Sequence, residues 1–287
     1  MLLLANEWDD YKILDAGNGE KLEQWGEVVL CRPDPQIIWK TDKKVKAWDQ
    51  INGMYHRSEK GGGEWEIRKP FPKKWTVKYK GLTFNIKPTG FKHTGLFPEQ
   101  AANWDFIISK IKNANRPIKV LNLFAYTGGA TCAASYGGAA EVVHVDASKG
   151  MVAWAKDNAE SSGLSHNKIR YIVDDVFKFV EREHRRGNQY DAIIMDPPSY
   201  GRGPKGEIWK LEDELQELLE LTAKILKKDP LFLLVNAYTT GFSHISLNNM
   251  MIQVFGDGYK FTSGEIGIPI EKSEMVLPCG IYARLEK

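Results

Sequence analysis

The run Asp196-Pro197-Pro198-Ser199-Tyr200 carries the side chains best suited to chemistry. An ionised aspartate only accepts hydrogen bonds, and prolines have a fixed φ and no N–H, so the turn is stiff and its carbonyls stay available as acceptors. Tyr200 adds a flat aromatic face. Such a turn suits a planar group whose amino hydrogens meet Asp196 and the carbonyl of Pro197 while its ring lies against Tyr200. The alternative is a proline-rich turn without chemistry.

A glycine-containing segment follows an earlier apolar run. It reads Phe124-Ala125-Tyr126-Thr127-Gly128-Gly129 and separates a predicted strand from a predicted helix. Glycines there let a ligand approach the backbone, and the N-terminus of the helix favours a carboxylate or a phosphate. The segment does not contain the Gly-x-Gly-x-x-Gly dinucleotide fingerprint, and any strand-to-helix turn can carry two glycines.

Carboxylates end two further predicted strands. Asp146 comes 18 residues after Gly128, and a carboxylate in that place can accept from both hydroxyls of a ribose. The alternative is a helix cap formed together with Ser148. At Asp174-Asp175 the two side chains point to different faces, so one is expected to cap the next helix. We expect Asp175 to accept from the exocyclic amine of an adenine.

The elements that must position these residues alternate from about residue 98 onward. Near-continuous apolar strands between amphipathic helices predict a parallel sheet covered on both faces, with an antiparallel hairpin at the end of the chain. The expected strands are 120–124, 141–146, 169–173, 190–196, 231–235, 259–268 and 281–285, and the expected helices are 130–136, 148–162, 176–186, 211–227 and 243–255. In open sheets of this class, ligands bind beyond the carboxyl ends of the strands. A nucleoside-bearing cofactor would occupy the first three sites, and a planar substrate the fourth.

Residues 1–85 differ from the rest of the chain in their residue pattern. They predict a small β-rich domain, which is followed by a larger domain at 86–287. Expected short strands are 27–30, 36–39, 64–67 and 75–79, with a hairpin turn at 79–82. Between Lys40 and Lys92 there are 14 Lys/Arg against 5 Asp/Glu, interleaved with 8 aromatic residues. This mixture suits RNA phosphates and unstacked bases. The alternative is an ordinary β domain with an aromatic core and solvated lysines.

Composition sets outer limits on the class of protein. The chain has 287 residues, 43% hydrophobic and 26% charged, with a net charge of +2, which is ordinary for a soluble globular protein. No apolar run approaches the roughly 18 residues of a membrane helix, and the apolar start is too short for a signal peptide. The three cysteines are far apart, which predicts reduced thiols in the cytoplasm and no metal site.

Taken together, four motifs resemble a class I S-adenosylmethionine-dependent methyltransferase, and more narrowly the bacterial family of large-subunit ribosomal RNA methyltransferases. They are Phe91-Lys92-His93-Thr94-Gly95-Leu96-Phe97-Pro98-Glu99-Gln100, Leu121 to Gly128, Val145-Asp146-Ala147-Ser148 and Met195 to Tyr200. The resemblance implies a Rossmann-like, mostly parallel sheet of seven strands. It implies that the cofactor is lined by Phe97, Gln100, Phe124, Ala125, Tyr126, Thr127, Gly128, Asp146, Ala147, Ser148 and Asp175. It also implies that Asp196, Pro197, Pro198 and Tyr200 face the acceptor.

The positions of the cysteines bear on which atom of the substrate accepts the methyl group. Methylation at C5 of cytosine needs a thiolate that adds to the ring, and enzymes of that kind in this family carry it near the end of strand five or in the last strand. Residues 235–240 and 282–284 contain none, Cys279 precedes the last strand, and Cys132 lies in a predicted helix. A base nitrogen in RNA is therefore the leading prediction. The alternatives are C5 of cytosine, a protein amide or small molecule, and a non-catalytic RNA-binding protein.

One more segment follows the acceptor motif. Residues 201–206 are glycine-rich and contain Arg202 and Lys205, so they are a candidate for a loop that closes over the substrate and touches phosphate. An ordinary surface loop is the alternative.

Overall fold

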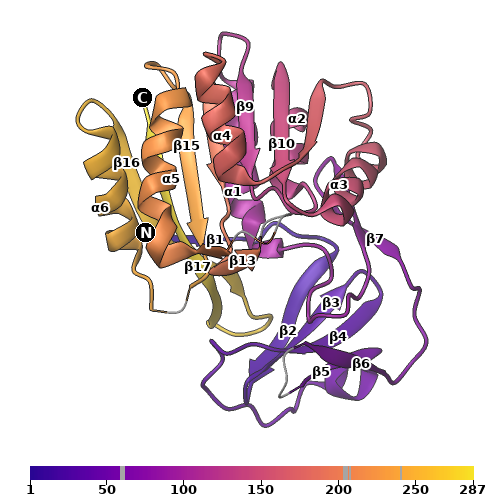
Figure 1. Ribbon diagram of the computed structural model, residues 1–287. Helices are drawn as coiled ribbons and strands as arrows, with labels where there is room; N and C mark the ends of the chain where they lie inside the picture. Colours follow the sequence, from indigo (N-terminus) through magenta and orange to yellow (C-terminus); the bar gives the residue numbers. More distant parts are fainter. Residues whose placement is uncertain (59–61, 203–205, 207, 240) are drawn as a thin grey trace. The chain divides into compact units, whose positions relative to one another are not determined.

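The computed structural model of the chain describes residues 1–58, 62–202, 206, 208–239 and 241–287 (Figure 1). These residues form two compact units. The first contains Met1–Leu3, Asn103–Ile266 and Gly280–Lys287, and the second contains Leu4–Ala102 and Gly267–Cys279. The boundary expected at residue 85 follows a change in residue pattern, whereas the compact units follow contacts, so the two divisions of the chain differ.

A large, mostly parallel sheet organises the first unit. Its described strands, in spatial order, are β1 (Leu2–Leu4), β16 (Lys260–Pro269), β17 (Val276–Glu286), β15 (Phe232–Ala237), β12 (Ala192–Met195), β9 (Lys119–Leu123), β10 (Glu141–Asp146) and β11 (Ile169–Val173). The strands from β15 to β11 run parallel, and β17 runs antiparallel to β15. The predicted α/β class is confirmed. The described sheet has eight strands rather than seven, because Leu2–Leu4 is too short for its pattern to mark it as β1.

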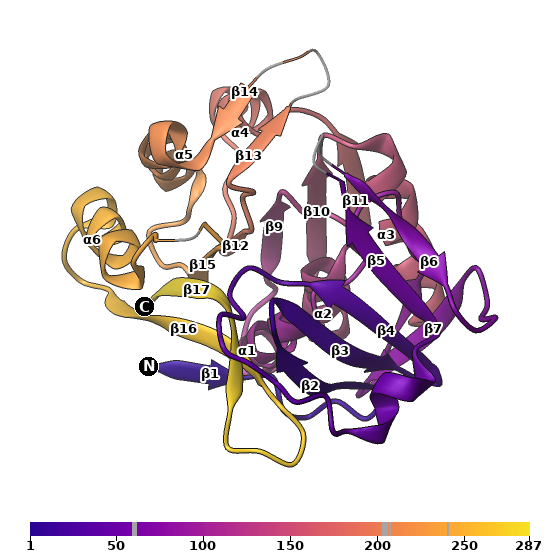
Figure 2. The same cartoon turned by 90° about the horizontal axis from the view of Figure 1, so that it is seen from below.

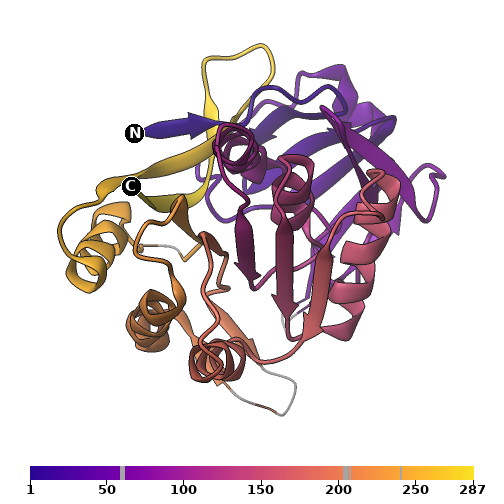
Figure 3. The ribbon, with the colours of Figure 1, turned by 90° about the horizontal axis from the view of Figure 1, so that it is seen from above.

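Helices cover both faces of this sheet (Figures 2 and 3). On one side lie α1 (Ala101–Lys112), α2 (Gly129–Tyr136) and α3 (Lys149–Ser161), and on the other lie α4 (Val176–Arg185), α5 (Leu211–Ile225) and α6 (His244–Phe255). One continuous apolar core joins Leu121, Ile193 and Leu233 of the sheet to Phe179 of α4 and Leu215 of α5. Each such side chain contributes about 1.5–3 kcal/mol through its burial, so the strand ends are held on a rigid frame.

The second unit is built from short strands. Its described strands are β2 (Tyr11–Gly17), β3 (Glu20–Trp25), β4 (Val28–Pro33), β5 (Gly53–Arg57) and β6 (Gly63–Ile67) in one sheet, and β7 (Trp75–Tyr79) and β8 (Leu82–Ile86) in another. These strands pair antiparallel, except for β4 and β5, which pair parallel. The hairpin turn expected at 79–82 is confirmed, since Tyr79 pairs with Leu82. Trp25, Tyr79 and Phe84 are buried, so part of the aromatic content forms core.

The strand expected at 36–39 is wrong. These residues belong to no strand, and Ile38 is 90% exposed. Pro33 and Pro35 flank the start of this segment, and a proline cannot donate to a β ladder. The apolar pair at 37–38 therefore does not mark a strand.

A short hairpin follows the acceptor motif. It pairs β13 (Tyr200–Arg202) with β14 (Ile208–Lys210), so part of the segment expected to be a loop is strand. Residues 203–205 lie outside the described residues, and the expected closure over a substrate involves them. No helix in the described part of the chain is long and apolar enough to cross a membrane. Among the same residues, no three His, Cys, Asp or Glu side chains lie together as they would around a metal ion.

Candidate active site

Four strand ends meet at one edge of the large sheet. The strands β12, β9, β10 and β11 are neighbours in that order and run parallel. Leu123 of β9 pairs with Met195 on one side and with Val145 on the other, and Asp146 pairs with Val173. The segments that leave these strands therefore start side by side. The strand order also reverses at β9, which is where ligands bind in open α/β sheets.

The segment after β9 has an unusual backbone. Phe124, Tyr126 and Gly128 all have positive φ, at 53°, 49° and 80°. For the two aromatic residues this left-handed conformation costs about 1–2 kcal/mol each, and such outliers gather at functional sites. Left-handed residues in a turn orient neighbouring backbone N–H groups into a concave surface that binds anions. The predicted ligand-binding loop thus has a backbone suited to a carboxylate.

The carboxylate of Asp146 is tied to this loop. Its Oδ2 accepts from the backbone N–H of Tyr126 and its Oδ1 from that of Ser148, both at 2.8 Å. Burial raises the pKa of Asp146, and these two N–H groups oppose the rise. Ionised carboxylate oxygens offer about four lone-pair sites, so capacity for a diol remains. Ala147 forms the turn, and Ser148 caps α3 by accepting from Met151, as predicted.

Helix α3 also holds the loop that follows β9. Asn158 is buried, and its Nδ2 donates to the carbonyl of Thr127 at 2.8 Å. A Cβ placed on Gly128 would lie 2.8 Å from the Cβ of Ala155, so only glycine fits this close approach. Sequence reasoning missed Asn158. Its one signal is the spacing that puts it on the same face of α3 as Ala155.

The carboxylates after β11 have separate partners. Asp174 accepts from the side chain of Arg182 at 2.5 Å. Asp175 is the N-cap of α4 and accepts from the N–H of Lys178 through Oδ1 at 3.0 Å. Of this pair, Asp175 is therefore the helix cap, and its predicted role toward an adenine stays a prediction. No donor in the described part of the chain reaches Oδ2 of Asp175, so this oxygen has acceptor capacity for an amine.

Some backbone carbonyls of the acceptor motif accept hydrogen bonds from other residues, and one does not. Pro198 accepts from Nε1 of Trp209 at 2.5 Å, and Ser199 accepts from the N–H of Leu211 at 3.1 Å. No donor of the described residues reaches the carbonyl of Pro197. This is the carbonyl that the sequence suggested for an amino group.

The remaining side chains of the motif differ in exposure. Asp196 is half-buried, and its N–H contacts the carbonyl of Leu123 at 3.4 Å, which links the motif to β9. Tyr200 is 51% exposed on β13. Thr239, in the segment after β15, donates to the hydroxyl of Ser199 at 2.7 Å. The motif is thus held on both sides while the ring of Tyr200 is accessible.

Sequence reasoning also missed Trp209. Its ring packs against Phe124, with centroids 4.9 Å apart, and against Phe177. Since its Nε1 holds Pro198, one side chain connects the loop after β9 to the acceptor motif. No local pattern singles out Trp209, because its partners are 11 residues away or more.

Two predicted cofactor residues belong to the second unit. Phe97 is half-buried and precedes the short 3₁₀ helix Pro98–Gln100, and Gln100 is buried. The indole N–H of Trp8 donates to the carbonyl of Pro98 at 2.9 Å. The role of Phe97 and Gln100 toward a cofactor stays a prediction.

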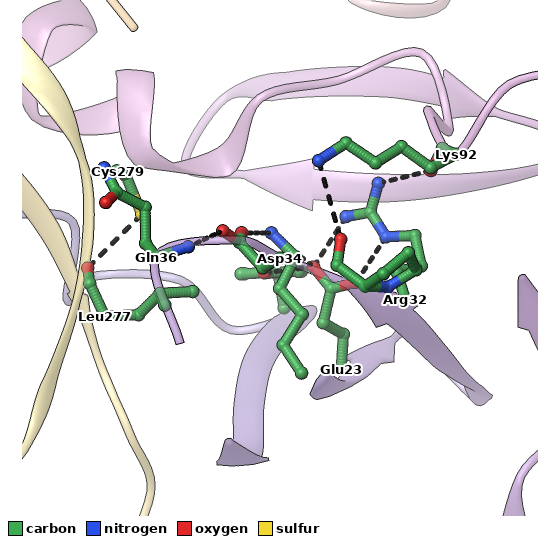
Figure 4. A network of polar contacts seen from close by, with 10 residues as sticks. Glu23, Arg32, Asp34, Gln36, Lys92, Leu277 and Cys279 are labelled. Atoms are coloured by element: carbon green, nitrogen blue, oxygen red, sulfur yellow. Dashed lines mark hydrogen bonds and ion pairs between the residues drawn. The ribbon is translucent and has the colours of Figure 1, made fainter. Parts of the chain in front are cut away.

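The expectation that Cys279 precedes the last strand is wrong, because Cys279 lies within β17 (Val276–Glu286). In all three cysteines, burial raises the pKa of the thiol. Burial raises the pKa of both Cys31 and Cys132 to about 12. Burial, and then the charge of Glu99, raise the pKa of Cys279 well above its ordinary value, and its thiol lies 3.3 Å from the carbonyl of Leu277 (Figure 4). Because the thiolate is the reactive form, all three are held as thiols.

As a donor set, the site suits a nucleoside-bearing cofactor. Asp146 offers acceptors for a ribose diol, Asp175 offers one for an adenine amine, and the loop offers backbone N–H groups for a carboxylate. The residues present therefore fit S-adenosylmethionine, which carries all three groups.

Comparison with known proteins points the same way. Residues 45–236 match the profile of a family described as S-adenosylmethionine-dependent methyltransferase. The crystal structure of a SAM-dependent methyltransferase from Agrobacterium tumefaciens superposes with a TM-score of 0.95 at 36% identity, covering 100% of this chain and 93% of that one.

Curated relatives carry more specific names. The chain is 32% identical over 190 residues to ribosomal RNA large subunit methyltransferase I of Photobacterium profundum, covering 66% of this chain and 45% of that protein. It is 28% identical over 221 residues to ribosomal RNA large subunit methyltransferase K of Neisseria meningitidis serogroup B, covering 74% and 61%. The chain therefore spans about half the length of these relatives.

Proposed function

The chain belongs to the S-adenosylmethionine-dependent methyltransferase family, and from this premise we propose that it methylates a base nitrogen in ribosomal RNA. One observation carries the choice of acceptor. Directly after β12, the carboxylate of Asp196 is followed by Pro197, whose carbonyl no donor of the described residues occupies. Two adjacent acceptors suit the two hydrogens of an amino group.

In this proposal the chain holds the methyl donor through the strand ends. Asp146 accepts from the ribose hydroxyls, Asp175 accepts from the adenine amine, and the N–H groups of residues 124–128 face the carboxylate. Phe97 and Gln100 complete the cofactor contacts, as the resemblance implies. S-adenosylmethionine, when bound, supplies a methyl group on a positively charged sulfur. The residues of the chain align that group with the acceptor, since methyl transfer depends mainly on proximity and orientation.

The acceptor motif orients the nitrogen. Asp196 and the carbonyl of Pro197 accept from its hydrogens, which turns the nitrogen lone pair toward the methyl group. Tyr200 lies against the base ring. The nitrogen would bond to the methyl carbon as the bond between that carbon and sulfur breaks, so that S-adenosylhomocysteine would leave. Asp196 would take up the proton that the nitrogen loses. Trp209 and Thr239 hold the backbone and side chain of the motif in place.

The state of the cysteines supports nitrogen over C5 of cytosine. A C5 reaction needs a thiolate, whereas the pKa values of Cys31, Cys132 and Cys279 are all raised by burial. Enzymes that use a cysteine nucleophile lower its pKa instead.

The names of the curated relatives and the basic stretch between Lys40 and Lys92 support ribosomal RNA as the substrate. Because the chain spans only part of those relatives, the substrate is part of the proposal. A cytoplasmic location follows from that substrate. Nucleoside mapping of ribosomal RNA by mass spectrometry, in a strain that lacks the gene, identifies the missing methylated base. Labelled product that resists nuclease digestion points instead to a protein amide or a small molecule.

Two substitutions test the acceptor chemistry. Asp196→Ala should lower kcat by about a hundred-fold, the lower range for a positioned proton acceptor, while affinity for S-adenosylmethionine measured by calorimetry stays the same. Cys279→Ala should retain activity. If Asp196→Ala retained its activity, this carboxylate would have no role in the reaction. If Cys279→Ala lost all activity, methylation at C5 of cytosine would be favoured instead.

A further inference from the structure

Three buried polar side chains of the first unit lie close to the loop after β9 and bond to one another. Asn122 of β9 donates from Nδ2 to Oγ1 of Thr131 in α2 at 2.9 Å. The same oxygen lies 2.9 Å from Nδ1 of His144 in β10. Each of the three side chains is at most 2% exposed. We call them the Thr131 network.

We propose that Asn122, Thr131 and His144 are positioning residues that set the affinity for S-adenosylmethionine, because they fix the first turn of α2, and the loop before it, against the sheet. This inference rests on the proposed function, which assigns residues 124–128 and Asp146 to the cofactor. All of these residues belong to the first unit.

The hydroxyl of Thr131 can use both of its bonding directions. The amide nitrogen of Asn122 only donates, so the oxygen of Thr131 accepts from it. Burial lowers the pKa of His144 to about 3, so the imidazole is neutral at physiological pH. A neutral imidazole has one nitrogen that accepts, and Nδ1 is in place to take the hydrogen of the hydroxyl. Such a two-sided arrangement holds Thr131 in one orientation.

The start of α2 needs this support because its N-cap is Gly128. A serine, threonine or aspartate at the N-cap would hold the helix start, but it would also accept from a first-turn N–H group. Those N–H groups are the ones that suit the carboxylate of a ligand. Glycine leaves them to the ligand. Thr131, the third residue of the helix, bonds to the sheet instead.

Backbone bonds join this first turn to the loop. The N–H of Gly128 donates to the carbonyl of Ala125 at 2.9 Å, and the carbonyl of Gly128 accepts from the N–H of Cys132 at 2.8 Å. The ring of His144 also lies close, since a Cβ built on Gly128 would be 3.6 Å from its Cε1. A displacement of Thr131 therefore moves the backbone of the loop.

The network also spans the two strands that end at the site. Asn122 and His144 are partners in the register of β9 and β10, so their side chains stand side by side on one face of the sheet. Side chains two residues apart in a strand share a face, so Asp146 lies on the face of His144. The network thus fixes the loop relative to the carboxylate of Asp146. S-adenosylmethionine joins its own carboxylate and its ribose in one molecule, so this spacing bears directly on affinity.

Two substitutions at one position test the inference. Thr131→Val keeps the shape of the side chain and removes the hydroxyl. It should weaken the binding of S-adenosylmethionine about two- to twelve-fold, the range expected for one hydrogen bond. Thr131→Ser keeps the hydroxyl and should bind as the original chain does. Calorimetry on the full chain measures the affinity without any methyl acceptor, so the result does not depend on which nitrogen is methylated.

Ser135→Ala is the matched control, because it removes the same kind of bond from the other end of α2. Asn167 donates from Nδ2 to Oγ of Ser135 at 2.8 Å. Urea unfolding should show both Ser135→Ala and Thr131→Val to be less stable than the original chain. Only Thr131→Val should lose affinity. Asn122→Leu should weaken binding as well, and combining it with Thr131→Val should add little further loss, since residues of one network do not act additively.

Asp146→Asn separates failure of this inference from failure of the proposed function. If Asp146→Asn and Thr131→Val both bind as tightly as the original chain, the cofactor does not use these strand ends, and both proposals are wrong. If Asp146→Asn binds weakly but Thr131→Val matches Ser135→Ala, the network is merely structural and only the inference is wrong. Equal losses in Thr131→Ser and Thr131→Val would also overturn it, because the hydroxyl would then not be the cause.

Discussion

Replacing Gly128 with alanine tests the strained loop most directly. Gly128 has a φ of 80°, and a Cβ built on it would lie 2.8 Å from the Cβ of Ala155 in α3. Two separate costs arise. The left-handed conformation costs an alanine about 1–2 kcal/mol, and crowding in a packed interior costs about 1–3 kcal/mol. The expected loss in the free energy of unfolding is therefore roughly 2–5 kcal/mol.

Gly138 provides the matched control. Its φ is 91°, but no atom lies within 4 Å of the position its Cβ would take. Gly138→Ala should therefore lose only the conformational term, about 1–2 kcal/mol. Urea unfolding of the two variants isolates the crowding at Gly128. Calorimetry should also show S-adenosylmethionine bound about ten-fold more weakly by Gly128→Ala, a difference of about 1.4 kcal/mol, and unchanged affinity for Gly138→Ala.

A double substitution tests whether residues 128 and 155 crowd each other. Ala155→Gly removes the crowded Cβ, at about 1 kcal/mol for a glycine inside a helix. If the crowding is real, the double variant should be more stable than the sum of the two single losses by about 1 kcal/mol or more, since residues in contact do not act additively. Simple additivity, or equal losses in Gly128→Ala and Gly138→Ala, would refute the steric account of this loop.

Three further outcomes are expected. Asp146→Asn should weaken S-adenosylmethionine binding by about ten-fold or more, because the amide replaces an acceptor with a donor; unchanged affinity in calorimetry rejects the ribose role. Burial raises the pKa of Glu99 from 4.5 to about 7, so between these pH values the native state keeps a proton that the unfolded chain has lost. The free energy of unfolding should fall by roughly 3 kcal/mol as pH rises through this window, and urea titrations should show no such slope for Glu99→Gln. Trp209→Phe keeps the ring but frees the carbonyl of Pro198, so kcat should fall several-fold at unchanged cofactor affinity; a fall in affinity alone would contradict this role.

Much of the frame could be predicted from the sequence because it depends on local pattern. Continuous apolar runs between amphipathic segments indicate parallel strands covered by helices, and the cap at Ser148 follows from its residue type and position. The same logic failed at residues 36–39, where apolar residues that follow prolines form no strand. It also failed at Leu2–Leu4, where three residues are too few to show a pattern.

Some features of the candidate site could likewise be predicted from the sequence, and others could not. The sequence by itself determined that Asp146 and Asp196 end apolar strands. It placed Cys279 before the last strand, which is wrong, because β17 begins at Val276 and contains this cysteine. Only the tertiary structure decided that Leu123, Val145 and Met195 are in register, so that the segments after them share one edge. It also decided that Trp209 occupies the carbonyl of Pro198 and leaves that of Pro197 available. Local pattern encodes burial and secondary structure, whereas the choice of which distant side chain meets which carbonyl is made by packing.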